Sequence, residues 1–165
     1  MDELLDVVNE QDEIVGQAPR EEANHNPAII HREIGILIAD QEKRVLLQQR
    51  SKHKTNPGLW ILSVAGHVTS GLTYEEAAHK ELREELGFDT QLTLLSKELV
   101  RLPSESIFEA LFEGNYTNQE INFDPYETEA IRFFSRDEFE AFFATDNQIE
   151  PVSAATTRAY WTRNL

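Results

Sequence analysis

Apolar residues occur along this chain in short runs that are separated by polar turns rich in asparagine, glycine or proline. Residues 6–17, DVVNEQDEIVGQ, have two such runs around a polar centre and predict an N-terminal hairpin. EIGILIAD and RVLLQQR, at residues 33–40 and 44–50, flank the turn QEK and predict a second hairpin. The first of these strands is almost continuously apolar, which is typical of burial on both faces. Residues 20–30, between the hairpins, are expected to form a loop around an Asn-Pro pair.

The rest of the chain predicts further strands and three helices. WILSVAG, residues 60–66, predicts a strand that Gly66 ends. Thr73 followed by Glu76 is a capping box, so a helix begins there, and Gly87 is its natural C-cap. Strands are then expected over residues 91–100, 106–114 and 130–134, and helices after Ser135 and Pro151. Together these elements predict an α/β fold with a mixed sheet, in which one helix follows directly on a glycine loop.

The first predicted helix carries three glutamates on one face. Glu81, Glu84 and Glu85 are spaced i, i+3 and i+4, which brings their Cβ atoms within about 5–6 Å of one another. One explanation is a solvated acidic face on which Lys80 pairs with Glu76 and Glu84. The other is a divalent cation, because unneutralised carboxylates at this spacing destabilise a helix by a few tenths of a kcal/mol. Ligands that are all oxygen favour Mg²⁺, or Mn²⁺ in its place, over zinc.

Composition restricts the classes of partner. Fifteen Lys and Arg against 30 Asp and Glu in 165 residues give a formal net charge of −15, which argues against general nucleic-acid binding. No apolar run approaches the roughly 20 residues of a membrane span, and the acidic N-terminus does not resemble a signal peptide, so we expect a cytoplasmic protein. The absence of cysteine removes disulfides and thiol nucleophiles. No heptad or apolar stripe decides the oligomeric state, so a homodimer is left open.

One segment, KRVLLQQRSKHK, breaks the acidic trend. It contains five basic residues and no acidic one: Lys43, Arg44, Arg50, Lys52 and Lys54. It is either a solvated hairpin and loop or a cationic lip for a small anionic substrate. In the second case Arg50 and Lys52, at the end of the predicted hairpin, are the expected phosphate contacts.

Residues 66–88, GHVTSGLTYEEAAHKELREELGF, resemble the Nudix box, whose pattern is GX5EX7REUXEEXGU with U a bulky aliphatic residue. The matching positions are Gly66, Glu81, Leu82, Glu84, Glu85 and Gly87. Phe88 fills the last bulky position, and NPGLW at residues 56–60 resembles the approach to the box. The resemblance implies a Nudix-type α/β/α sandwich with a mixed β-sheet. It also implies a single domain over residues 1–165, in which residues 1–28 form an N-terminal hairpin extension.

Two positions depart from the pattern. Leu72 stands where the pattern has glutamate, and Lys80 stands where it has arginine. In the family these two residues are expected to hold the loop against the helix, so a less tightly braced loop is expected here. Glu76, one helical turn back, is a substitute partner for Lys80, although an exposed pair of this kind is worth only about 0.3–0.5 kcal/mol.

The resemblance implies hydrolysis of a diphosphate linkage between a nucleoside diphosphate and a group X, with Mg²⁺ as the cofactor. Glu81 and Glu85 are the expected metal ligands, and Glu84 is a third ligand or a group that positions water. Gly66 and His67 are expected beside the small-molecule substrate, which the box does not identify further.

The general base lies either in the box, at Glu84 or Glu85, or in a later segment. The later candidates are Glu105, Glu127 and Glu129. Three aromatic residues are candidates for stacking a nucleobase, although core packing is their commoner use: Trp60, Phe108 and Tyr126.

The N-terminal hairpin, the following His25 and His31, and the Gly66-His67 pair resemble more specifically the isopentenyl diphosphate isomerase branch of the family. That enzyme needs a cysteine before the Gly-His pair, where this chain has Ala65, so an isomerase is the alternative to a hydrolase. His25, His31 and His67 are either ordinary polar residues or ligands of a second metal ion. The two departures from the box keep a third class open, a weakly active sensor that binds a nucleotide or metabolite.

Overall fold

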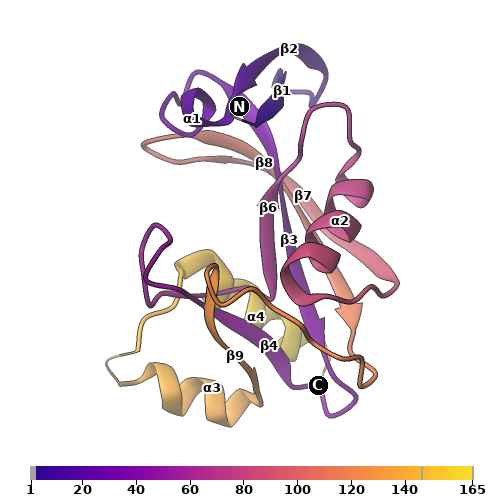
Figure 1. Ribbon diagram of the computed structural model, residues 1–165, viewed down its shortest axis with the longest axis vertical. Coiled ribbons are helices and arrows are strands. Elements are labelled where there is room, and N and C mark those ends of the chain that lie inside the picture. The colour runs from indigo at the N-terminus through magenta and orange to yellow at the C-terminus, as the bar shows by residue number, and fades with distance from the viewer. Residues whose placement is uncertain (1–2, 146, 165) are drawn as a thin grey trace.

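The computed structural model describes residues 3–145 and 147–164 and confirms the predicted α/β class (Figure 1). In the described part of the chain a mixed sheet lies between helices. The elements are β1 (Leu4–Val8), β2 (Ile14–Pro19), α1 (Arg20–Ala23), β3 (Ile30–Ala39), β4 (Val45–Arg50), β5 (Trp60–Ile61), β6 (Val64–His67), α2 (Tyr74–Leu86), β7 (Leu92–Arg101), β8 (Ser106–Asn115), β9 (Thr128–Phe134), α3 (Arg136–Phe143) and α4 (Pro151–Arg163). In the described part of the chain, no helix is both long enough and apolar enough to cross a membrane.

Strand β3 is the centre of the sheet. Along one edge it pairs in parallel with β8 over its whole length, and β7 continues the sheet beyond β8. Along the other edge three antiparallel partners follow one another: β1 at Ile30, β6 between Glu33 and Ile36, and β4 at Ile38 and Ala39. Strand β4 carries β9 and β5, so the sheet divides along β3 and leaves β4 and β6 on diverging courses (Figure 1).

A buried hydroxyl lies where the sheet divides. The segment 60–66, expected to be a single strand, is two short strands with Ser63 between them. Ser63 Oγ accepts a hydrogen bond from Ile38 N at 2.8 Å and donates one to the Leu46 carbonyl at 2.6 Å. The side chain therefore satisfies backbone groups of β3 and β4 at the point where these strands part.

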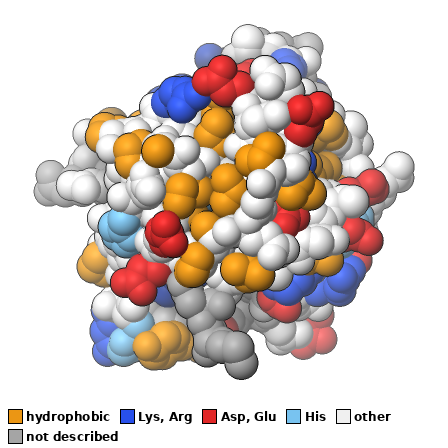
Figure 2. Space-filling model, turned by 90° about the horizontal axis from the view of Figure 1, so that it is seen from above, with side chains coloured by type: hydrophobic (Ala, Val, Ile, Leu, Met, Phe, Trp, Pro, Cys, Tyr) orange, Lys and Arg blue, Asp and Glu red, His pale blue; other side chains and the backbone are white. Residues whose placement is uncertain are grey.

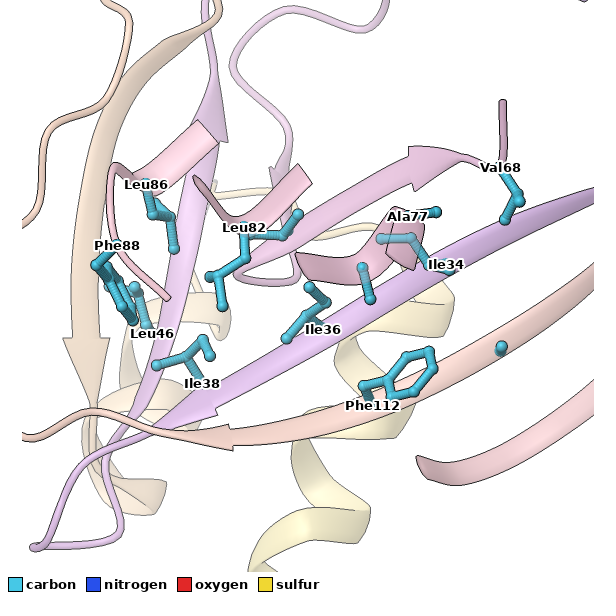
Figure 3. Packing of buried hydrophobic residues seen from close by; sticks show 13 residues of the cluster. Ile34, Ile36, Ile38, Leu46, Val68, Ala77, Leu82, Leu86, Phe88 and Phe112 are labelled. Carbon is cyan, nitrogen blue, oxygen red and sulfur yellow. The ribbon is translucent and has the colours of Figure 1, made fainter. Parts of the chain in front are cut away.

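Side chains of β3 alternate between two cores. Ile34, Ile36 and Ile38 face α2, where Leu82 and Leu86 are buried against them (Figure 3). Ala78 belongs to the same buried cluster and completes the predicted stripe. On the opposite face Leu37 and Ala39 pack with aromatic residues of α3 and α4, which are Phe139, Tyr160 and Trp161. Full burial of one such leucine contributes about 1.5–3 kcal/mol. These two cores make the three layers of the predicted α/β/α sandwich.

Local capping signals fix the helix ends. The capping box of Thr73 and Glu76 is formed in both directions at the start of α2, and Gly87 ends this helix with φ of 76°. Ser135 caps α3 in the same way. One local expectation was wrong, because residues 20–30 contain the short helix α1. The last helix begins at Pro151 as predicted, and Glu150 caps it by accepting the Ser153 N–H at 2.6 Å.

The N-terminal hairpin, β1 and β2, forms as predicted and lies with α1 at one end of the molecule (Figure 1). Strand β2 is the end strand of its branch of the sheet, and Ile14 and Val15 on it are exposed. Figure 2 shows this end of the molecule, with apolar side chains gathered on its surface and charged ones around them. The hairpin matters for the site because Glu3 and Arg20 line the same cleft as α2.

Candidate active site

A polar cleft of about 940 Å³ is lined by α2, β4, β6 and the loops that precede β5 and β9. Twelve residues singled out from the sequence lie in it: His25, Arg50, Lys54, Ala65, Gly66, His67, Lys80, Glu81, Glu84, Glu85, Glu105 and Glu127. Lys52, Leu72, Gly87 and Glu129 do not line it. The Nudix-box segment, the end of β4 and two later loops therefore share one cavity.

Glu81 lies directly against Gly66. A Cβ atom at Gly66 would stand 2.9 Å from Glu81 Cδ, closer than two carbon atoms can pack. Gly66 also pairs with Ile34 of β3, so strand β6 is held in place from its other side. Glycine thus leaves room for a carboxylate of the same chain, which a larger residue would push aside. Burial raises the pKa of Glu81, and Glu84 adds to that effect.

Glu85 is the most enclosed carboxylate of α2. Gln48 Nε2 donates a 2.7 Å hydrogen bond to Glu85 Oε2, and Thr128 Oγ1 donates a 2.6 Å bond to Gln48 Oε1. Burial raises the pKa of Glu85 to about 8, the Gln48 bond opposes this rise, and the charges of Glu81 and Glu127 add to it. The expected rise from crowded carboxylates is therefore present, with burial as its larger cause.

Lys80 binds two glutamates of its own helix. Its Nζ lies 2.8 Å from Glu81 Oε1 and 2.8 Å from Glu84 Oε2. The prediction that Glu76 pairs with Lys80 was wrong. The Glu76 carboxylate instead accepts hydrogen bonds from the N–H and the hydroxyl of Thr73, at 2.9 and 2.8 Å. Glu84 is 59% exposed, so it has part of the character of a solvated acidic face.

The three box glutamates do not form a closed ligand set. Within the described residues, the single group of three acidic or histidine side chains with ligand atoms all within 4.8 Å of one another is His31, Glu33 and His67. Glu81, Glu84 and Glu85 share the cleft but not that degree of convergence. A cation that uses two or three of them must draw Lys80 away from Glu81 and Glu84 or share these carboxylates with it.

The basic segment is divided between two places. Arg44 pairs with Asp40 at 2.8 Å in the turn between β3 and β4, away from the cleft. Arg50 lines the cleft, and its Nε donates to the Thr55 carbonyl at 2.6 Å. Burial lowers the pKa of Arg50, although the nearby charges of Glu85 and Glu127 partly oppose this decrease. Lys52 is exposed and lies outside the cleft, whereas Lys54 lines the cleft. Of the five basic residues of the segment, only Arg50 and Lys54 therefore line the cleft.

The later base candidates lie at different ends of the cleft. Glu127 is beside the box glutamates, with its carboxylate 3.1 Å from Lys54 Nζ. Glu105 lies at the other end, 3.9 Å from His31 Nε2, and burial raises its pKa. Glu129 is exposed and does not line the cleft.

Trp60 and Phe108 are buried and serve the core, whereas Tyr126 is 60% exposed. Its ring stacks on His53 with centroids 4.4 Å apart.

Glu33 and His67 line the end of the cleft near Glu105, and the fully buried His31 lies against them; we call these three residues the histidine group. Glu33 Oε1 lies 3.6 Å from His31 Nε2 and 3.1 Å from His67 Nε2. His31 is fully buried, and neither of its ring nitrogens has a hydrogen-bond partner among the described residues. Burial lowers the pKa of His67 to about 4, so this ring is neutral at pH 7. The expected third histidine, His25, lines the cleft but lies outside this group.

Sequence reasoning missed several residues of the cleft. Glu33 had a local signal, since it is a carboxylate at the start of a strand that is otherwise almost wholly apolar. Gln48 and Thr128 had none, because their importance comes from the alignment of β4 with β9. Lys54 was not separable from Lys52 without the path of the loop.

Residues 29–155, more than half of the chain, match the family model of the NUDIX domain. The chain belongs to the Nudix family. The resemblance noted for residues 66–88 is thereby confirmed, as are the Nudix fold and the assignment as an enzyme of the Nudix hydrolase family.

Relatives of this Nudix chain have two kinds of name. It is 34% identical over 127 residues to isopentenyl-diphosphate Delta-isomerase 2 of Photorhabdus laumondii, covering 73% of this chain and 71% of that protein. It is 39% identical over 87 residues to an uncharacterised Nudix hydrolase of Streptomyces coelicolor, covering 52% and 48% of the two proteins. Among solved structures it is similar to DR0079 of Deinococcus radiodurans, with a TM-score of 0.79, 26% identity and coverage of 96% and 99%.

Nudix enzymes use a divalent metal ion, and this chain offers oxygen and nitrogen ligands for one. Glu85 fits such an ion because it is a deeply enclosed carboxylate with no ion pair in the described part of the chain. The histidine group fits one because a fully buried imidazole lies beside a carboxylate with both ring nitrogens unbonded. The cleft thus has two places whose chemistry suits a cation.

Proposed function

We propose that this Nudix protein hydrolyses a diphosphate linkage in a small molecule that joins a nucleoside diphosphate to a group X. One observation carries the proposal. Glu81, which lies against Gly66, and Glu85, which is deeply enclosed, line the same cleft as the cations Arg50 and Lys54. Carboxylates that hold a cation, together with basic groups for phosphate oxygens, are what phosphoryl transfer to water requires.

We assign the metal to the carboxylates of α2, with Mg²⁺ as the natural ion and Mn²⁺ as a substitute. When bound, the ion supplies neutralisation of phosphoryl oxygens and orientation of the attacking water. Glu85 and Glu81 would supply the two carboxylates that hold it. Glu84 would be a third ligand or a group that positions water.

Arg50 and Lys54 receive the diphosphate in this proposal. Water attacks one phosphorus atom, and the bond from that phosphorus to the bridging oxygen breaks. The proton of the water passes to a carboxylate, and the leaving phosphate takes the electron pair. Glu127 is our first candidate for the proton acceptor, because it lies at the box end of the cleft beside Lys54. Glu105 is the second, and its distance from the box glutamates makes it the weaker choice.

An isomerase acting on an isoprenoid diphosphate is the second candidate. It is favoured by the histidine group and by relatives that are named isopentenyl-diphosphate isomerase. It is opposed by Ala65, whose methyl group lines the cleft directly before Gly66 and His67 and cannot transfer a proton. A sensor that binds without turnover is the third class.

One experiment separates the three. The protein is incubated with Mg²⁺ and a panel of nucleotide sugars, dinucleotides, nucleoside triphosphates and isopentenyl diphosphate, and products are read by mass spectrometry. Hydrolysis that falls about 100-fold or more in Glu85→Gln, the loss typical of one charge-stabilising group, supports the hydrolase. Migration of the double bond supports the isomerase, and ligand-induced stabilisation without products supports the sensor.

The matched control is Glu75→Gln. Glu75 is an exposed glutamate on the same helix that does not line the cleft, so its replacement should leave turnover unchanged. Unaltered metal binding and activity in both Glu81→Gln and Glu85→Gln would show that the site is assigned to the wrong carboxylates.

A further inference from the structure

The loop between β6 and α2, residues 68–73, is fastened to strands on two sides; we call it the box loop. On one side Val68 N donates a 2.9 Å hydrogen bond to the Arg32 carbonyl of β3. On the other side Ser70 N donates a 2.8 Å bond to the Leu4 carbonyl of β1, and Thr69 forms an antiparallel bridge with Leu5. The N-terminal hairpin therefore pairs directly with the backbone of the box loop.

Asp6 is the side chain at the centre of this contact. It is only 4% exposed, and both of its carboxylate oxygens bind the box loop. Oδ1 accepts the hydroxyl of Ser70 at 2.6 Å, and Oδ2 accepts the backbone N–H of Gly71 at 3.0 Å. Gln17 of β2 donates to the same Ser70 hydroxyl at 2.5 Å. Burial raises the pKa of Asp6, but the bonds from Ser70, Gly71 and Gln17 outweigh it, so the pKa lies below its usual range.

The loop conformation at this contact requires glycine. Gly71 has φ of +87°, in the left-handed region that side chains other than glycine rarely adopt. Nothing lies within 4 Å of a Cβ placed there, so the backbone angle, and not the available space, demands glycine. Gly71, which has this angle, is also the residue whose backbone N–H donates a hydrogen bond to Asp6.

The side chains that the box pattern leads one to expect for holding this loop do not do so here. Leu72 stands at the glutamate position and packs, half-buried, against the core beneath α2. Lys80 stands at the arginine position and binds Glu81 and Glu84. The buried charged group that grips the loop comes from β1, sixty-five residues before Gly71 in the sequence.

We infer that Asp6 is a positioning residue for the candidate active site: through Ser70 and Gly71 it fixes the box loop and thereby holds α2 against β6. The loop joins Gly66, against which Glu81 lies, to Thr73, where α2 begins. A shift of the loop moves the start of α2 relative to β6 and so changes the distance between Glu81 and Gly66. The inference rests on the proposed function only for its effect on turnover.

The first test measures the loop itself and needs no substrate. Amide hydrogen exchange is followed in the full chain for wild type, Asp6→Ala and Glu10→Ala. Glu10 is the control, an exposed carboxylate of the same hairpin that pairs with Arg101 of β7 and has no hydrogen bond to the box loop in the described part of the chain. Asp6→Ala should speed exchange at Ser70 and Gly71 by about tenfold or more, the size expected for lost bonds to a charged group.

Glu10→Ala should leave exchange at these two amides within about twofold of wild type. Equal exchange at Ser70 and Gly71 in Asp6→Ala and wild type overturns the inference. If Asp6→Ala does not fold, Ser70→Ala takes its place, because it removes the partner from the loop side. Faster exchange at Gly71 then supports the inference and unchanged exchange overturns it.

The second test separates positioning from a general loss of stability. Mn²⁺ affinity, kcat and KM are measured for Asp6→Asn alone and in a Leu72→Glu/Lys80→Arg background, which supplies the residues of the box pattern. Asp6→Asn should lower kcat and Mn²⁺ affinity by about tenfold, and the loss should shrink to about threefold or less in the background variant. An undiminished loss overturns the inference. If wild type hydrolyses nothing, the proposed function fails, whereas exchange and Mn²⁺ affinity still decide the role of Asp6.

Discussion

Gln48 on β4 holds the carboxylate of Glu85 on α2 through a hydrogen bond of 2.7 Å, and Thr128 on β9 holds Gln48 through one of 2.6 Å. Gln48 and Thr128 are both buried, so the three side chains form a polar chain between the helix and two strands. A buried chain of this kind rigidifies its members when each is satisfied. The bond therefore fixes the orientation in which Glu85 would meet a cation.

Replacement of Gln48 should weaken metal binding without destroying the fold. Gln48→Met keeps the volume of the side chain and removes its amide, so Glu85 loses the bond that orients it. We expect Mn²⁺ or Mg²⁺ affinity to fall by about 10–100-fold, as for other residues that orient a metal ligand. Thr128→Val should have the smaller effect because Gln48 keeps its bond to Glu85. Calorimetric titration of both variants checks the order, and equal affinity in Gln48→Met and wild type would contradict the assigned role.

Adding one methyl group at Gly66 should displace Glu81. The new Cβ would lie 2.9 Å from Glu81 Cδ, and overpacking of this kind costs about 1–3 kcal/mol. Gly16→Ala on β2 is the control, because a Cβ there meets nothing within 4 Å. Urea unfolding should show a loss of stability in Gly66→Ala that exceeds the change in Gly16→Ala, and hydrolysis should fall only in Gly66→Ala. Similar stability and turnover in the two variants would rule out the close contact as a constraint.

Local signals carried most of the prediction of the fold. The capping boxes at Thr73 and Ser135 and the C-cap at Gly87 were correct because each depends on residues within one helical turn. The single strand expected over residues 60–66 was wrong because its break depends on Ser63, which binds two other strands. Nothing next to Ser63 in the sequence announces those partners.

The candidate site was predictable to the extent that it lies on one helix. The spacing of Glu81 and Glu85 placed both in the cleft, since the period of a helix is fixed. Glu33 and Gln48 were missed because they reach the cleft through strand alignment, in which Glu33 pairs with His67. Strand alignment depends on the packing of the whole sheet, so one sequence does not reveal it.

Glu109 should make the metal-free protein less stable as the pH rises. Burial, then the charges of Glu33, Glu150 and Glu98, raises its pKa from 4.5 to about 7. Between these two values the folded state holds a proton that the unfolded state has released, so the free energy of unfolding falls as the pH rises through this window. Urea unfolding of wild type and Glu109→Gln at pH 5 and pH 8 checks this. Wild type should lose more stability over the interval, and parallel losses in the two proteins would contradict the assignment.

The histidine group should bind a cation independently of the box glutamates. His31, Glu33 and His67 offer ligand atoms within 4.8 Å of one another, and imidazole with carboxylate suits Zn²⁺ or Mn²⁺. A cation present at about 100 times its Kd stabilises the folded state by roughly 2.7 kcal/mol. We expect Zn²⁺ to raise the Tm of wild type and of Glu81→Gln, and to lose this effect in Glu33→Gln.

His25→Asn is the control for that experiment, because His25 lines the cleft but lies outside the histidine group. Its replacement should leave the Zn²⁺-induced rise in Tm intact. A rise that survives in Glu33→Gln and disappears in Glu81→Gln would place the cation at the box glutamates instead. That outcome would also remove the structural observation that favours an isomerase, because the histidine group would then hold no cation.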